Sequence, residues 1–103
     1  MFDKQTETKI NEAVALELTN VCKTYGKSYH SLHEGYAVLL EEIEEAEKDF
    51  EYIKNHLMCL WENVKLDDVI SVKGNARSIA YDAVELAKEA VQVAAVCTKI
   101  QRG

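Results

Sequence analysis

The sequence contains no proline and only four glycines among its 103 residues. These two residue types interrupt helices most strongly, so their scarcity favours long, continuous helices. Hydrophobic residues make up 48% of the chain, which supplies enough apolar material for a core and argues against disorder. The composition predicts an all-α protein with a single domain that spans residues 1–103.

The chain also lacks the features of several protein classes. Its three cysteines, Cys22, Cys59 and Cys97, form no CxxC or Cys/His pattern, which predicts reduced thiols and argues against a zinc site. No apolar run approaches the length of a membrane span, and the first residues do not resemble a signal peptide. We therefore expect a soluble, cytoplasmic protein without a membrane partner.

Positive charge is scarce as well. The chain has 12 basic and 18 acidic residues, a formal net charge of −6, and no basic block. Proteins that bind the nucleic-acid backbone need clustered positive charge, so this balance argues against a nucleic-acid partner. An acidic chain is better suited to metal ions.

Two helices are expected in the first two thirds of the chain. Apolar residues spaced by three and four predict a first helix over residues 3–23, which Gly26 can close in a left-handed conformation. Ser31-x-x-Glu34 is a capping-box pattern, in which both side chains bind the first free amides of a helix. The second helix should run from there to about Val64 and be the longest element.

The segment 65–75 interrupts the helical pattern. It contains the only Gly-Asn pair, Gly74-Asn75, so we expect the connection between the second and third helices there, with at most a short helical turn inside it. The third helix is then predicted from about Asn75 or Ala76 to Ile100.

Both long helices carry extended apolar stripes. Three helices of one short chain can hardly cover all of this surface, so we expect an antiparallel bundle completed by a second subunit. The stripe of the second helix consists of Leu32, Tyr36, Leu39, Ile43, Ala46, Phe50, Ile53, Leu57, Trp61 and Val64. The third helix has a small-residue stripe and a bulky one: Ala76, Ala80, Ala83, Ala87, Ala90, Ala94 and Cys97, then Ile79, Leu86, Val93 and Ile100.

Six carboxylates lie between Glu41 and Asp49. At about 100° per residue, Glu41, Glu42 and Glu45 can direct three of these groups into one volume. They would repel one another there, and Mg²⁺, which prefers oxygen ligands, would relieve the repulsion and recruit a phosphorylated substrate. The alternative is a solvated acidic face of the kind that most amphipathic helices carry.

The third helix carries a second polar stripe. Its members are spaced by three, four and three residues, and Glu89 lies nearest the apolar border: Asp82, Glu85, Glu89 and Gln92. No Ser-His-Asp or Cys-His arrangement can be assembled, so covalent catalysis is not expected.

Two segments, residues 33–45 (HEGYAVLLEEIEE) and residues 88–97 (KEAVQVAAVC), resemble the small MazG-like proteins of phages and prophages. Those proteins are similar to the all-α NTP pyrophosphohydrolases. In that superfamily, Glu-Glu-x-x-Glu on one helix and Glu-x-x-Asp on a later helix bind Mg²⁺, which holds a nucleoside triphosphate for cleavage between its α and β phosphates. The resemblance covers about 70 residues, from His33 onward.

Carried over to this chain, the resemblance implies four metal ligands: Glu41, Glu42, Glu45 and Glu89. The last acid of the second motif is replaced by Gln92, whose neutral amide should weaken binding of a divalent cation. Asp82 and Glu85 form another acid pair on the same helix and are additional candidates. No residue can be assigned as the catalytic base.

Two functions follow from these patterns. The resemblance implies a pyrophosphohydrolase that uses Mg²⁺ or Mn²⁺, converts a nucleoside triphosphate to a monophosphate and pyrophosphate, and forms a homodimer or homotetramer. The alternative is a catalytically inactive phage or prophage protein that keeps the helical bundle and acts through protein–protein contacts.

Overall fold

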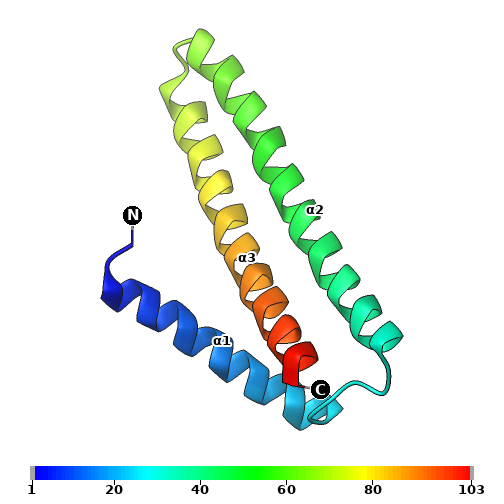
Figure 1. Cartoon of the computed structure of the whole chain (residues 1–103). Helices are drawn as coiled ribbons and strands as arrows, with labels where there is room; N and C mark the ends of the chain where they lie inside the picture. The colour runs from blue at the N-terminus through cyan, green and yellow to red at the C-terminus, as the bar shows by residue number, and fades with distance from the viewer. Residues whose placement is uncertain (1, 103) are drawn as a thin grey trace. The chain divides into compact units, whose positions relative to one another are not determined.

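The computed structural model describes residues 2–102, and within them it contains three α-helices and no strand (Figure 1). The helices are α1 (Lys4–Tyr25), α2 (Leu32–Lys65) and α3 (Val69–Arg102). The all-α prediction is confirmed. The second helix is not the longest element, because α2 and α3 each have 34 residues.

Both ends of α1 carry caps. Asp3 is the N-cap, and its Oδ1 accepts a hydrogen bond of 2.7 Å from the Thr6 amide. At the other end, the Gly26 amide donates to the carbonyl of Cys22 at 2.9 Å. Gly26 has φ 90° and ψ 173°, so its φ is positive as expected, but its ψ is extended rather than left-handed helical. Only glycine adopts this conformation without strain.

The predicted capping box begins α2 in a modified form. Ser31 Oγ accepts a hydrogen bond from the Glu34 amide at 3.1 Å. The Glu34 carboxylate accepts from the amide of His30 at 3.0 Å, which is one residue before the usual partner. Both side chains therefore fix the chain path through the connector into α2.

The predicted start of α3 at Asn75 or Ala76 is wrong by nearly two turns. The connection comprises only Leu66–Asp68, and Asp67 takes the turn with φ 54°. Asp68 then caps α3, because its carboxylate accepts hydrogen bonds from Ser71 N at 3.1 Å and Ser71 Oγ at 2.7 Å. Gly74 lies inside α3 and does not mark a helix boundary.

The contacts divide the chain into two compact units. The first unit contains the residues up to Ile43 and those from Glu89 onward, so it combines α1 with the beginning of α2 and the end of α3. The second unit, Glu44–Lys88, is a helical hairpin made of the remaining parts of α2 and α3. Among the described helices, none is long and apolar enough to cross a membrane.

In the first unit, α2 and α3 lie close together at Gly35. A Cβ atom at this position would lie 3.2 Å from Ile100 Cγ1 and 3.3 Å from Tyr29 Cδ2, both shorter than ordinary van der Waals contacts. Leu18, Ala95 and Val96 are buried and supply the apolar core of this unit.

Polar pairs join the two helices of the second unit. Asn63 Nδ2 donates to Asn75 Oδ1 at 2.7 Å, and His56 Nδ1 lies 2.7 Å from Asp82 Oδ2. The two pairs are separated by seven residues on each helix, which is the repeat of a coiled-coil seam. We call them the polar layers. Gly74 and Asn75 lie within α3, and the hydrogen bond to Asn63 ties this part of α3 to α2.

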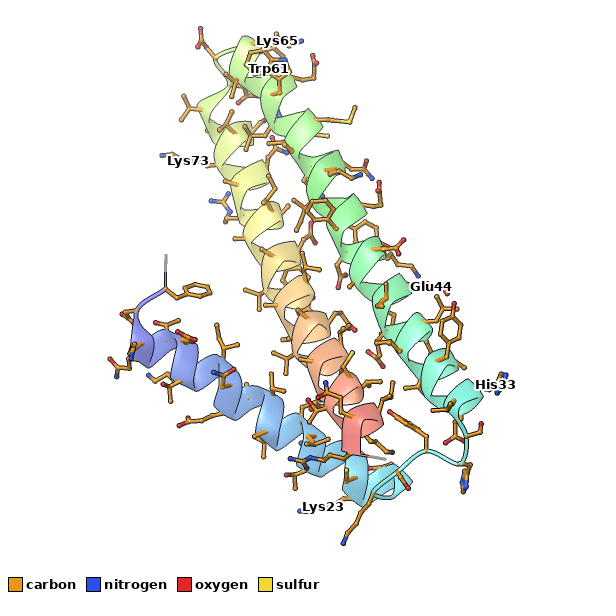
Figure 2. The ribbon with its side chains drawn as sticks, viewed as in Figure 1. Lys23, His33, Glu44, Trp61, Lys65 and Lys73 are labelled. Carbon is orange, nitrogen blue, oxygen red and sulfur yellow. The ribbon has the colours of Figure 1, made fainter. Side chains whose placement is uncertain are left out.

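Much of the predicted apolar stripe of α2 lies at the surface of the single chain. In the second unit, Trp61 is 57% exposed and its ring lies beside Lys65, whose Nζ is 5.7 Å from the ring centroid (Figure 2). Other members of the stripe that remain exposed are Leu32, Tyr36, Ile43, Phe50, Leu57 and Val64. The chain therefore leaves an apolar surface uncovered, and all three cysteines are free thiols.

Candidate metal-binding site

The three acids of the first motif lie on consecutive turns of α2. Glu41 and Glu45 are exposed, whereas Glu42 is half-buried and belongs to the side of α2 that faces α3 in the first unit. Along α2, Glu42 belongs to the first unit and Glu45, three residues later, to the second. A shared metal site of the three acids stays a prediction.

The two acidic motifs meet through Glu42 and Glu89. One carboxylate oxygen of Glu42 lies within 4.8 Å of one on Glu89, which is also half-buried. Two negative charges this close oppose each other unless a positive group or a hydrogen-bond donor lies between them. A divalent cation bound by both oxygens would meet this requirement.

Gln92 supplies such a donor from α3. In the amide orientation that satisfies both neighbours, Gln92 Nε2 donates to Glu42 Oε2 at 2.9 Å and to Glu89 Oε2 at 3.0 Å. A neutral amide therefore bridges the two carboxylates at the position where the resemblance implies an aspartate. It reduces their repulsion without adding charge.

The same amide can serve a metal in its other orientation. A half-turn of the terminal torsion exchanges Nε2 and Oε1, which would turn an acceptor oxygen toward a cation held by Glu42 and Glu89. The residues present therefore fit an oxygen-ligated cation. Their total negative charge is one lower than in the complete motif pair, so affinity should be lower.

The additional candidates, Asp82 and Glu85, have other partners in the second unit. Asp82 is 8% exposed and pairs with His56 in one of the polar layers. Glu85 accepts a hydrogen bond of 3.0 Å from Lys88 Nζ. Both acids therefore have partners within the second unit, whereas Glu42 belongs to the first.

A cavity of about 450 Å³ in the first unit adjoins the acids. Glu41 and Glu42 border it together with two residues of the α1–α2 connector, Tyr29 and His30; the remaining lining residues are Val21, Glu34, Val38 and Val96. Its volume lies in the range of small-molecule sites. Sequence patterns did not predict Tyr29 or His30 as site residues, because a connector has no periodicity that assigns a face to its side chains.

Tyr29 gives this cavity a neutral, partly desolvated wall. Burial raises the pKa of its phenol above the usual value of 10.0, and the negative charges of Glu34 and Glu42 add to the effect. Ionisation of Tyr29 is therefore disfavoured, and its hydroxyl remains a proton donor at neutral pH.

Comparison of the chain with protein-family models, with curated proteins and with solved structures gives no significant match.

Proposed function

We propose that this chain is a MazG-like nucleoside triphosphate pyrophosphohydrolase that uses Mg²⁺ or Mn²⁺. The observation that carries the proposal is the approach of Glu42 on α2 to Glu89 on α3, with oxygens within 4.8 Å of each other. Helix periodicity alone does not require acids from two motifs, 47 positions apart in the sequence, to converge. Their convergence supports a shared ligand.

In the proposed reaction, the acids bind the metal and the adjoining cavity accommodates the nucleotide. Glu42 and Glu89 would hold the cation, with Glu41 and Glu45 on the same stretch of α2 as further ligands. A bound Mg²⁺ would supply electrostatic stabilisation of the triphosphate and would lower the pKa of coordinated water. A water oxygen would bond to the α phosphorus while the bond from that phosphorus to the bridging oxygen breaks; pyrophosphate would leave, and the proton of the attacking water would pass to solvent or to the leaving group.

A second function is favoured by a specific contact. Because Gln92 donates to both Glu42 and Glu89, the acids are stabilised without a cation. A chain of this kind can keep the fold after losing the chemistry and act through its exposed apolar surface. This is the alternative of an inactive protein–protein interaction module.

Pyrophosphate release tests the enzyme proposal. The assay uses a panel of nucleoside triphosphates with Mg²⁺ or Mn²⁺, and compares wild type with Glu42→Gln and Glu89→Gln. Loss of one charged metal ligand should lower the rate at least about tenfold. Glu44→Gln is the matched control, because Glu44 is exposed and points outward from α2 (Figure 2).

The outcomes separate the two functions. Turnover that is lost in Glu42→Gln and kept in Glu44→Gln supports the hydrolase. Turnover that is equal in all variants means that other residues, or a contaminant, perform the reaction. Metal binding without turnover indicates a degenerate binding module, and the absence of both indicates an interaction protein.

A further inference from the structure

Lys99, near the end of α3, is the most unusual side chain of the first unit. It is fully buried, with 0% of its surface exposed, and no atom of the described residues accepts a hydrogen bond from its Nζ. Its neighbour is the face of the Tyr29 ring, whose centroid lies 4.0 Å from Nζ. A buried ammonium needs acceptors, and a cation–π contact replaces only part of its hydration.

Lys99 borders a cavity of about 250 Å³ that is separate from the metal ligands. The cavity lies at the start of α2, and its other lining residues are Tyr29, His30, Ser31, Leu32, Gly35 and Ile100. The first amides of a helix have no acceptor inside the helix, and the helix dipole places partial positive charge there. Ser31 Oγ accepts a hydrogen bond from the amide of Glu34. The amides that precede Glu34 in the first turn point out of the N-terminal end of the helix.

Two buried side-chain atoms at this cavity lack a hydrogen-bond partner within residues 2–102. Tyr29 Oη, like Lys99 Nζ, is buried and has no hydrogen-bond partner among the described residues. The one carboxylate of the first turn of α2, Glu34, accepts the amide of His30. A buried ammonium and a buried hydroxyl that can both donate, next to a helix N-terminus, favour an acceptor with negative charge.

We propose that this cavity binds a phosphate group, either as free phosphate or as the phosphate of a monoester. Lys99 Nζ would supply the charge, Tyr29 Oη a hydrogen bond, and the first turn of α2 its backbone amides. A volume of about 250 Å³ holds a phosphate and part of an attached group. The proposal does not rest on the pyrophosphohydrolase function, because Glu42 and Glu89 do not line this cavity.

Calorimetry and thermal melting with inorganic phosphate, in a chelator and against chloride at matched ionic strength, provide the test. Wild type should bind phosphate saturably and melt at a higher temperature in phosphate than in chloride. Lys99→Met keeps the apolar stem and removes the charge, so its affinity should fall about tenfold or more. Without phosphate, this variant should melt at a higher temperature than wild type, because the buried unpaired charge is gone.

Two further variants make the test specific. Lys73→Met is the charge-matched control, because Lys73 is exposed in the second unit and points away from α2; it should bind phosphate like wild type (Figure 2). Tyr29→Phe keeps the ring beside Lys99 and removes only the hydroxyl, so it should fold and bind several-fold more weakly. If Lys99→Met does not fold, the phosphate affinity of Tyr29→Phe decides the test.

A nucleoside monophosphate and its nucleoside distinguish the sources of the phosphate group. Tighter binding of the monophosphate than of inorganic phosphate, with no binding of the nucleoside, supports a phosphomonoester ligand. Equal binding of both phosphates supports free phosphate. The proposal is overturned if phosphate has no more effect than chloride on wild type, or if every folded variant at Lys99 and Tyr29 binds like wild type.

Discussion

His56 Nδ1 lies 2.7 Å from Oδ2 of Asp82, a carboxylate that is only 8% exposed. Removal of one partner leaves a part-buried polar atom without its bond, so Asp82→Ala should destabilise the protein by about 1–2 kcal/mol. His56→Gln should have a similar effect, and the double variant should lose less than the sum of both. Urea denaturation measures all three, with Glu62→Gln on the exposed side of α2 as the control. Additive losses would show that the two groups do not interact.

Gln92→Asp should exchange hydrogen-bond stabilisation for metal affinity. The variant loses the amide that donates to Glu42 and Glu89 and adds a third negative charge, so in chelator it should be about 1–3 kcal/mol less stable. Mg²⁺ or Mn²⁺ should raise its melting temperature more than that of wild type, because hard cations respond to ligand charge. Pyrophosphate release should rise in parallel if the missing acid limits activity.

The control for this exchange is Gln101→Asp, which places the same change at an exposed position of α3. It should alter neither the stability in chelator nor the metal-dependent shift. Equal metal shifts in wild type and Gln92→Asp would argue against a cation at this site.

Alanine should have opposite effects at two glycines inside helices. Gly35→Ala gains helix propensity, but its Cβ meets Ile100 and Tyr29 at 3.2 and 3.3 Å, so we expect a net loss of about 1 kcal/mol. At Gly74, a Cβ atom meets only Arg77 Nη2 at 3.9 Å, so Gly74→Ala should gain about 1 kcal/mol. Thermal melting of both variants decides this, and a stabilised Gly35→Ala would show that the contact yields without strain.

The cap of α3 predicts a pH effect of definite sign. Hydrogen bonds from Ser71 Oγ and Ser71 N lower the pKa of Asp68 below its usual 3.8. A folded-state pKa below the unfolded one stabilises the fold fully above the unfolded value, and this contribution is lost as pH falls through the folded value. Asp68→Asn should therefore reduce the loss of stability on acidification from neutral pH to below 3.8. Thermal melting across this range should show a smaller change in this variant than in Asp67→Asn.

The exposed apolar surface predicts self-association. Leu57 and Trp61 are 55% and 57% exposed on α2, and large exposed apolar groups at helical spacing favour burial against another helix. Light scattering at micromolar concentration should show a dimer or tetramer, and Trp61→Gln should weaken it. Ala87→Leu should disturb any close contact made by the exposed small-residue stripe. A monodisperse species of 11.7 kDa would contradict the prediction.

Periodicity was sufficient to predict an all-helical chain of three helices. The predicted start of α3 is wrong because the Gly74-Asn75 pair, typical of a chain break, lies inside the helix, where Asn75 accepts a hydrogen bond from Asn63. Local propensity carries no information about a partner on another helix. For the same reason the sequence did not reveal that Gln92 bridges two acids.

Lys99 shows a second limit of sequence patterns. A lysine in the last turns of a helix is normally solvated, and neither composition nor spacing distinguishes one that is fully buried. Its burial depends on Tyr29, which lies in a connector, and on the close approach of α2 at Gly35. Lys99 is far from Tyr29 and Gly35 in the sequence, and only the folded chain brings the three residues together.

The polar layers also determine how the hairpin of the second unit can be aligned. Apolar residues repeat every seven positions, so a slide of α3 by one heptad would still match apolar groups with apolar groups. Such a slide would place His56 opposite Asn75, or Asn63 opposite Asp82, and would leave a charged or amide group of the other pair without its partner in a part-buried seam. The two pairs together therefore favour one register of the helices, because only that register satisfies both hydrogen-bonded pairs.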